Sequence, residues 1–204
     1  MKKENYSFFE RKRKPVSRLF MLVCLLLVLF TAPSWQRGSA IDIAFEVSGI
    51  LLVLAGVSGR LWATMYIGGR KNAELVMSGP YSMCRNPLYL FSFIAGIGIS
   101  LLLKNVALLA VFVVGFSIYY PLVIRSEEGR LRSYFGEAFD GYVATTPMFI
   151  PKFTGLSFEG ARFVPSLMWK NFKDSLGFLL FIPVTYLIAW LHESGALKVI
   201  SRLP

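Results

Sequence analysis

The sequence is poor in the residues that build metal sites and disulfide frameworks. Its 204 residues include one histidine, His192, and two cysteines, Cys24 and Cys84. A single imidazole without a cluster of thiols cannot supply the ligands of a zinc site, so we expect no metal centre. The two cysteines lie in separate parts of the chain, one in an apolar run and one in a polar loop, and they do not indicate a disulfide framework.

Acidic side chains are also scarce. Twelve aspartates and glutamates stand against 22 lysines and arginines, which gives a formal net charge of +10. The basic residues are spread over several loops rather than gathered on one folded unit, so we expect no nucleic-acid partner. We expect the positive charge to attract anionic lipid headgroups instead.

Apolar side chains, by contrast, are abundant. Hydrophobic residues make up 55% of the chain and aromatic residues 15%, and the mean hydropathy is +0.56. A soluble domain of this length has too little interior to bury so much apolar surface. Five apolar runs are long enough, or nearly so, to cross a bilayer as helices: 16–35, 41–59, 88–103, 106–124 and 176–191. The sequence therefore predicts an all-α, multi-pass membrane protein with about five transmembrane helices.

The distribution of basic residues predicts the orientation. If the N-terminus is cytoplasmic, the segments on that side carry eighteen Lys and Arg residues, and those on the other side carry four. Segments rich in Lys and Arg remain in the cytoplasm during membrane insertion. We therefore expect a cytoplasmic N-terminus and a C-terminus on the outside.

The first apolar run has a second interpretation. Basic residues 11–14 precede the apolar stretch 19–30, as they would in a secretory signal peptide. The sequence that follows, TAPSW at 31–35, is a poor cleavage site because Pro33 and Trp35 stand where small residues are needed. We favour an uncleaved span.

The apolar runs divide the chain into three parts. We expect a basic cytoplasmic arm at 1–15, a core of four helices with cytoplasmic loops at 16–151, and an interfacial segment plus a fifth helix at 152–204. Within the last part, residues 161–174 could form a short amphipathic helix at the membrane surface.

A tight hairpin is expected in the middle of the core. Only Lys104 and Asn105 separate the runs 88–103 and 106–124, which forces an antiparallel pair of helices. Polar residues just before Leu88 should therefore lie beside polar residues just after Ile124. Small residues on both arms, such as Gly96 on the first, would allow the arms to approach closely.

Two polar clusters flank this hairpin at its cytoplasmic end. The first covers residues 78–89, and the second covers 125–136. In a purely structural interpretation, the first is a turn with a basic anchor. The second is then a charged helix in which Glu128 pairs with Arg125 or Arg132 and which ends at Gly136.

Three blocks in and next to these clusters read LVMSGPY at 75–81, RNPLY at 85–89 and EEGRLRSYFGE at 127–137. Together they resemble the isoprenylcysteine carboxyl methyltransferase family and the related phospholipid methyltransferases. The family pattern has an LVxxGPY turn, an RHPxY block that opens a helix, and an EExxLxxxFG block after the next helix. Blocks in this order across a hairpin are far more specific than any one of them, and the resemblance covers residues 70–151.

The resemblance implies methyl transfer from S-adenosylmethionine to a membrane lipid or lipidated substrate, in a site facing the cytoplasm. The chain has no strand followed by a GxGxxG turn, which excludes a soluble Rossmann methyltransferase. Methyl transfer from a sulfonium asks the protein for alignment more than for a strong acid or base. By the same resemblance the cofactor pocket would be lined by Leu75, Val76, Tyr81, Asn86, Pro87, Leu88, Tyr89 and Glu127.

The chain departs from the family pattern at three places. Asn86 replaces the usual histidine of the second block, and Ala73 stands where relatives often carry another. Phe139 replaces the first tyrosine after the Phe-Gly pair, whereas Tyr142 keeps the second. Asn86 can form hydrogen bonds but cannot titrate, so imidazole base catalysis is not expected on this side of the membrane.

Arg85, Arg125 and Glu128 are the candidate catalytic residues. Two guanidiniums at the membrane surface suit an anionic acceptor such as a carboxylate or a phosphate oxygen. An amine acceptor would first have to lose a proton, and no histidine is near to take it. We therefore expect O-methylation of an anionic group in preference to N-methylation of a phospholipid.

Two further functions stay open at this point. A protein that kept the scaffold but lost catalysis would explain Asn86 and Ala73. Membrane sterol reductases, which use NADPH, share the Arg-x-Pro-x-Tyr block but are much larger.

Overall fold

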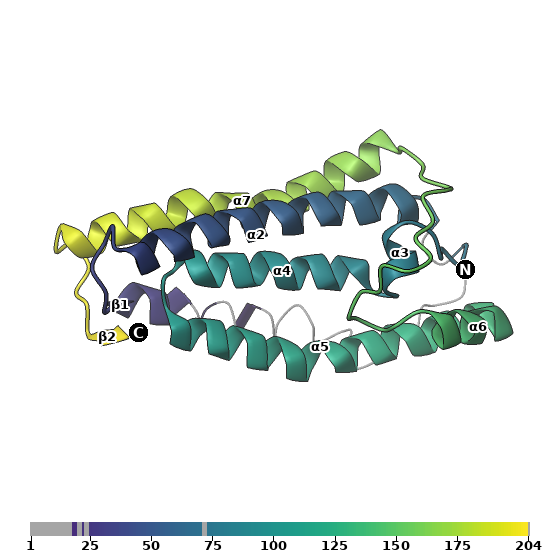
Figure 1. Ribbon diagram of the computed structural model, residues 1–204, viewed down its shortest axis with the longest axis horizontal. Coiled ribbons are helices and arrows are strands. Elements are labelled where there is room, and N and C mark those ends of the chain that lie inside the picture. Colours follow the sequence, from purple (N-terminus) through teal and green to yellow (C-terminus); the bar gives the residue numbers. More distant parts are fainter. Residues whose placement is uncertain (1–17, 20–21, 23–24, 71–72, 204) are drawn as a thin grey trace.

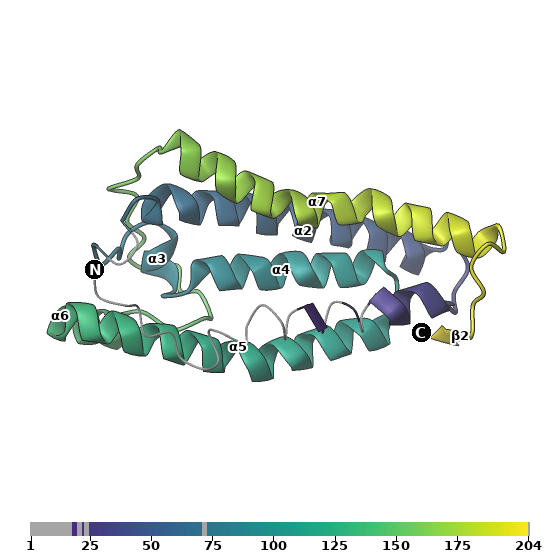
Figure 2. The same cartoon turned by 180° about the vertical axis from the view of Figure 1, so that it is seen from behind.

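The computed structural model describes residues 18–19, 22, 25–70 and 73–203, which are mostly helical. The elements are β1 (Thr31–Pro33), α2 (Ala40–Ile67), α3 (Pro80–Met83), α4 (Pro87–Leu102), α5 (Val106–Phe135), α6 (Glu137–Thr145), α7 (Pro165–Glu193) and β2 (Ser201–Leu203). The long helices run side by side, with α4 between α2 and α5, and with α7 along α2 (Figures 1 and 2). We refer to the two ends of this bundle as the α3 end and the β end.

The membrane character of the chain is confirmed. Three helices, α2, α5 and α7, are long and apolar enough to cross a bilayer, and α4 is a shorter apolar helix of 16 residues. The total of five spans and the orientation stay predictions, because the run 16–35 lies partly outside the described residues. Its described portion is helical over 25–30.

Two expected boundaries are wrong. The helix of the first run does not reach Trp35, because Thr31–Pro33 form β1 and pair in parallel with β2 near the C-terminus. Residues 161–174 do not form a separate interfacial helix. Instead α7 starts at Pro165, a residue suited to the first helical turn, and continues without a break to Glu193.

Local signals explain where the hairpin helices start and stop. Asn105 caps α5, since its Oδ1 accepts a hydrogen bond from the Leu108 amide at 2.9 Å. Gly136 ends the same helix with a positive φ of 53°, as the sequence predicted. α5 therefore extends more than two turns beyond Ile124 and carries its charged residues out of the apolar region.

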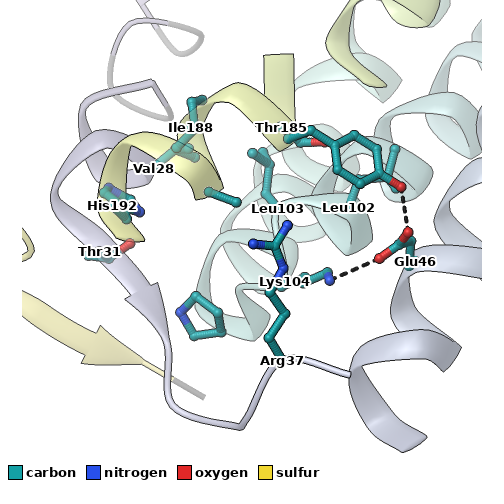
Figure 3. A pocket seen from close by; sticks show the side chains of 13 residues that line it. Val28, Thr31, Arg37, Glu46, Leu102, Leu103, Lys104, Thr185, Ile188 and His192 are labelled. Atoms are coloured by element: carbon teal, nitrogen blue, oxygen red, sulfur yellow. Dashed lines mark hydrogen bonds and ion pairs between the residues drawn. The ribbon is translucent and has the colours of Figure 1, made fainter. Parts of the chain in front are cut away.

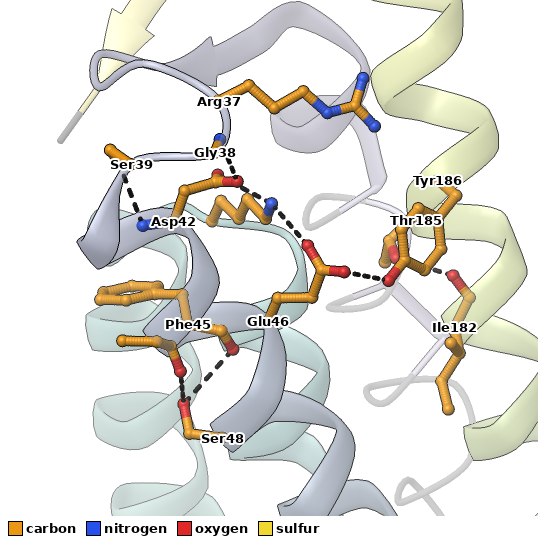
Figure 4. Close-up of polar contacts among 12 residues, drawn as sticks. Arg37, Gly38, Ser39, Asp42, Phe45, Glu46, Ser48, Ile182, Thr185 and Tyr186 are labelled. Carbon is orange, nitrogen blue, oxygen red and sulfur yellow. Dashed lines mark hydrogen bonds and ion pairs between the residues drawn. The ribbon is translucent and has the colours of Figure 1, made fainter.

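A charge cluster closes the hairpin at the β end. The Lys104 ammonium lies 2.7 Å from Asp42 Oδ1 and 3.1 Å from Glu46 Oε2, and Tyr186 of α7 donates to Glu46 (Figure 4). Asp42 is 4% exposed, so it is neutralised by Lys104 rather than solvated. A cavity of about 60 Å³ lies beside this cluster, between Arg37, Lys104 and His192 (Figure 3).

Most of the small residues of α4 face α2 rather than the second arm of the hairpin. A Cβ added at Gly98 would lie 2.7 Å from the Gly49 carbonyl oxygen, and one at Gly56 would lie 2.6 Å from the Phe91 carbonyl oxygen. Gly96 does face α5, where it meets the ring of Phe112. The closest backbone approach in this packing therefore joins α2 to α4, because glycines on both helices allow it.

Polar groups help α7 pack along α2. Arg60 Nε donates to Ser175 Oγ at 3.3 Å, and the Asn171 amide donates to Thr64 Oγ1. Arg60 also donates to Ser92 of α4. Hydrogen bonds between helices of this kind hold apolar helices together where lipid offers no hydrophobic driving force.

The α2–α4 contact gives a first prediction. Gly56→Ala should lower the stability of the protein in detergent by about 1–3 kcal/mol, because the new methyl group overlaps the α4 backbone. Gly129→Ala is the matched control, since that helical glycine has nothing within 4 Å and should gain up to about 1 kcal/mol. Thermal unfolding of both variants measures the effect. Equal stabilities would contradict this account of the packing.

Candidate functional site

The first polar cluster folds into a compact turn at the α3 end. Gly79 has a positive φ of 61°, and a Cβ there would lie 2.4 Å from the Tyr66 ring, so only glycine fits. Pro80 opens the short α3, and Pro87 opens α4 with Asn86 at its N-cap. The turn therefore places residues 80–89 at the α3 end of the bundle.

An ion pair joins this turn to the second cluster. Arg85 Nε lies 2.8 Å from Glu128 Oε1, and Arg85 Nη2 lies 3.1 Å from Glu128 Oε2. The two side chains are only 10% and 13% exposed. Arg85 Nη1 donates to the carbonyl oxygens of Thr146 at 2.6 Å and Val143 at 3.3 Å. The two-point geometry holds the carboxylate in one orientation.

Further side chains strengthen the contact between the two clusters. The Asn86 amide donates to Glu128 Oε1 at 3.0 Å and to the Met148 carbonyl oxygen at 3.1 Å. Tyr89 donates to Glu127 Oε2 at 3.0 Å, and Arg130 lies 3.5 Å from the same carboxylate. Both glutamates of the third block are thus engaged by the second block, across the hairpin.

Tyr81 presents a buried polar atom. Its hydroxyl is enclosed and has no hydrogen-bond partner among the described residues, and burial raises its pKa well above the usual value. Its backbone is held in place, since Tyr142 of α6 donates to the Tyr81 carbonyl oxygen at 2.6 Å. The ring packs in an apolar cluster with Val76 and, at the edge, Leu88. An enclosed hydroxyl without a partner is rare in a native structure and suggests a site for a ligand.

The Cys84 thiol lies in the same turn but is not exposed to reagents. It is fully buried, and burial raises its pKa to about 11. A thiol that is protonated at neutral pH is a weak nucleophile. We therefore assign Cys84 a packing role.

An apolar groove runs beside the turn. It has a volume of about 400 Å³. It is lined by Trp62 of α2, Met83 of α3, Phe91 and Ile94 of α4, and Phe153 of the loop between α6 and α7. The groove is lined almost wholly by apolar atoms and is open rather than enclosed. Its shape and lining suit a hydrocarbon chain more than a polar ligand.

The structure brings together most of the residues that the sequence singled out. Arg85, Asn86 and Tyr89 meet Glu127 and Glu128 directly. Val76, Tyr81 and Leu88 pack together beside them, with Pro87 buried. Leu75 is half-buried and precedes Val76 in the chain. The carbonyl oxygens of Val143, Thr146 and Met148 were missed, because main-chain acceptors leave no signal in side-chain patterns. Tyr142 was noted for keeping a family tyrosine, but its hydrogen bond to the Tyr81 carbonyl oxygen was not predicted.

Arg125 lies apart from this group. It is exposed, and the expected pairing of Glu128 with Arg125 or Arg132 is wrong. Glu128 pairs with Arg85, and Arg132 pairs with Asp140 at 2.7 Å instead. The hairpin geometry explains the difference, since Arg85 in the turn between α3 and α4 reaches Glu128 in a buried position that helical neighbours cannot offer.

The one histidine is far from the site. His192 ends α7 at the β end, where its Nε2 lies 2.9 Å from the Leu29 carbonyl oxygen. In the part of the chain that is described, no group of three or more His, Cys, Asp and Glu residues is placed to hold a metal ion.

The ion pair makes a prediction about stability. Arg85→Ala and Glu128→Ala should each lower the free energy of unfolding by about 3–5 kcal/mol, because each leaves a buried charge without its partner. The double variant should cost clearly less than the sum of the two, which a double-mutant cycle measures. Arg132→Ala is the control, since that pair is more than half exposed and should cost less than about 1 kcal/mol.

Cys84 allows a test of burial at the site. In a Cys24→Ala background, maleimide should label the folded protein at neutral pH at least about 100-fold more slowly than the unfolded protein. The pKa rise from 9.0 to about 11 alone lowers the thiolate fraction by that factor. The labelling rate should rise with pH up to about 11. Rapid labelling of the folded protein near neutral pH would contradict a buried thiol.

Comparison with known proteins agrees with this arrangement. The family model described as phospholipid methyltransferase matches residues 43–138, from α2 to the start of α6. The chain is 38% identical to the nickel-cobalt-cadmium resistance protein NccN of Alcaligenes xylosoxydans xylosoxydans over 85% of this chain and 81% of that one.

A second relative extends over almost the full length. The chain is 35% identical to the cobalt-zinc-cadmium resistance protein CzcN of Cupriavidus metallidurans over 97% of this chain and 91% of that one. No solved structure matches significantly. The matched region contains the hairpin, the turn at Gly79 and both halves of the Arg85–Glu128 pair, and the chain belongs to the phospholipid methyltransferase family of membrane proteins.

Proposed function

We propose that this protein transfers a methyl group from S-adenosylmethionine to a lipidic acceptor at the cytoplasmic face of the membrane. The observation that best supports this function is the Arg85–Glu128 pair, which joins the second and third sequence blocks at one end of the bundle. A site that aligns a donor with an acceptor must hold its walls in fixed positions, and alignment is the main task in this chemistry.

The donor would bind beside Tyr81. The enclosed hydroxyl lacks a partner among the residues described, and a ligand that pairs with it would remove the cost of leaving it unsatisfied. The resemblance assigns the remaining contacts to Leu75, Val76, Asn86, Pro87, Leu88, Tyr89 and Glu127. S-adenosylmethionine supplies an activated methyl group, so these residues need only bind it, orient it and exclude water.

Arg85 and Glu128 would act as positioning residues. Four of the five N–H groups of Arg85 are used by Glu128 and by two carbonyl oxygens. This leaves little of the guanidinium to contact an acceptor directly. Its proposed contribution is to hold Asn86 and Tyr89 in place, since Asn86 also binds Glu128.

The apolar groove would take the hydrocarbon part of the acceptor. Its walls include Trp62 of α2 and Phe91 of α4, and a membrane lipid that entered between these helices would not have to leave the bilayer. Its lining reaches Met83, one residue before Cys84 and two before Arg85. An acceptor whose chain lies in the groove would carry its polar group to the turn.

Arg125 is the guanidinium left for an anionic acceptor. On α5 it follows Ile118 and Leu122 along one side of the helix, and both are exposed. A basic side chain at the end of such an apolar side reaches the headgroup level, where carboxylates and phosphates lie. With His192 at the β end, no imidazole is near to deprotonate an amine. We therefore propose methylation of an anionic oxygen rather than of an amine.

The names of the relatives fit such a product. NccN and CzcN are named for resistance to divalent metals. Methylation of a carboxylate or phosphate removes a negative charge from the membrane surface, which would lower the local concentration of divalent cations. N-methylation of a phospholipid amine would leave that charge in place.

Radioactive transfer tests the reaction. Membranes containing the protein are incubated with methyl-labelled S-adenosylmethionine, and the extracted lipids are treated with mild base. We expect label in a lipid product that is released as methanol, as from a methyl ester. Base-stable label on phosphatidylethanolamine would show that the reaction is N-methylation and not O-methylation. No labelled lipid, together with no binding of the donor, would favour a protein without catalysis.

Variants separate positioning from folding. Glu128→Gln keeps the shape but loses the charge pair, and misalignment of this kind should lower kcat by about 100-fold with a smaller change in KM. Arg85→Lys should recover part of the loss relative to Arg85→Ala. Arg132→Ala, on the same helix but in an exposed pair, should stay within about twofold of the parent. Equal losses in all variants would contradict a specific role for the pair.

Tyr81→Phe tests the donor site by binding alone. Removal of a hydroxyl that bonds to the donor should weaken its affinity about tenfold without lowering stability, because the hydroxyl has no partner in the described structure. Tyr142→Phe is the control, since it loses a hydrogen bond to the protein and should lower stability. Titration calorimetry measures the binding of S-adenosylmethionine and of NADPH to both variants, and thermal unfolding measures their stability. Heat with NADPH alone would favour a reductase.

A further inference from the structure

The loop between α6 and α7 forms a strap across the α3 end. The strap comprises residues 147–164 and lies beyond the residues matched by the family model (Figure 1). Backbone hydrogen bonds attach it to α2 and to the turn around α3: Arg85 N to Pro147 O, Lys152 N to Met83 O, Gly79 N to Ser157 O and Arg162 N to Met65 O. The Tyr66 hydroxyl also donates to the Phe158 carbonyl oxygen. A loop tied down at this many points is a rigid part of the surface.

The outward face of the strap is apolar. Ile150, Phe153, Phe158 and Phe163 leave 66–79% of their surfaces exposed, and Trp169 at the start of α7 is 60% exposed. Large apolar side chains gathered on a rigid loop are not what water-facing loops carry. Some other medium must cover them.

The strap lies at the depth of the membrane boundary. Its residues Pro151 and Phe153 line the apolar groove together with Ser58, Gly59 and Trp62 of α2. At 28 residues α2 is about 42 Å long, against about 30 Å for the hydrocarbon core. Part of α2 must therefore extend into the headgroup region, and Arg60, the first charged residue after Glu46, interrupts its apolar run. The strap reaches back to this level.

Basic residues surround the apolar face. Lys152 and Arg162 belong to the strap, and Lys170 and Lys173 are exposed on the first turns of α7. Three acidic groups oppose them: Glu159 on the strap and Asp174 on α7 are exposed, and Glu74 lies 3.8 Å from Arg162. The local charge remains positive, which matches phosphate groups in an anionic leaflet.

We infer that the strap is a docking surface for the anionic lipids of the leaflet at the α3 end. Its apolar side chains insert between the headgroups, and its basic residues contact their phosphates. The mixture of aromatic tips and surrounding Lys and Arg is typical of surfaces that lie in the interface plane. A protein partner would explain the exposed apolar side chains but not their position at the depth of the headgroups.

The docking would reach the candidate site through the strap. Pro147 and Met148 of the strap accept hydrogen bonds from Arg85 and Asn86, and Ser157 binds the turn at Gly79 and Ser82. Movement of the strap relative to the leaflet would therefore move the turn. The docking itself rests on exposure, depth and charge and does not depend on the proposed methyl transfer.

Site-directed spin labelling of the full chain in nanodiscs tests the docking. In a Cys24→Ala background, one variant carries Phe163→Cys on the strap, and the control carries Ser133→Cys on the exposed end of α5. Buried Cys84 stays unlabelled. We expect the label at 163 to be accessible to oxygen and shielded from a water-soluble nickel chelate, and the label at 133 to show the opposite. Equal access of the chelate to both positions would overturn the inference.

Lipid composition tests the preference for anionic headgroups. Nanodiscs of phosphatidylcholine alone are compared with nanodiscs that also contain phosphatidylglycerol. We expect the label at 163 to be more deeply shielded in the anionic discs, with the difference reduced at high salt. Lys170→Gln and Lys173→Gln should each reduce the difference in shielding between the two lipid compositions, whereas Lys198→Gln and Arg202→Gln at the β end should not. The same depth in both lipids would overturn the anionic preference. Because the measured quantity is the depth of the label, this test of docking gives a result even if no methyl transfer is detected.

Discussion

The ion pair between Arg85 and Glu128 is the contact on which the α3 end depends. It joins the turn before α4 to the extension of α5 beyond the apolar region, and the hydrogen bonds of Asn86 and Tyr89 to Glu128 and Glu127 reinforce it. Because both side chains are nearly buried, neither can leave without leaving an unpaired charge behind. The carbonyl oxygens of Val143 and Thr146 extend this contact into and beyond α6. One pair thereby gathers α4, α5 and α6.

A different charge cluster performs the same task at the other end. Lys104, in the two-residue connection of the hairpin, lies between Asp42 and Glu46 of α2. Between the two ends, α2 and α4 approach through glycines, and Arg60 of α2 donates to Ser92 of α4. The bundle thus has charged clamps at its water-facing ends and close backbone packing in its middle, as expected where lipid surrounds the apolar part.

The family-matched region and the remainder have separate roles in this design. Residues 43–138 contain the hairpin, the turn and both halves of the ion pair. The strap and α7 follow, and they cover this core from outside: the strap through backbone bonds to the turn, and α7 through Arg60, Thr64 and their partners on α7. The apolar groove is formed by both, since α2 and α4 supply one wall and the strap supplies Pro151 and Phe153. Its shape can therefore differ between relatives without change in the core.

The amino-acid sequence was sufficient for the membrane character, the tight hairpin at Lys104 and Asn105, and the meeting of its two polar clusters. These follow from run length, loop length and ordered motifs, which are local properties of a chain. The partner of Glu128 was not accessible in that way. Helical spacing favoured Arg125 or Arg132, whereas Arg85 reaches Glu128 from the turn between α3 and α4 and is held by main-chain carbonyl oxygens that carry no sequence signature. The same holds for the strap, the groove and the β1–β2 pair, since each arises from contacts between segments far apart in the chain.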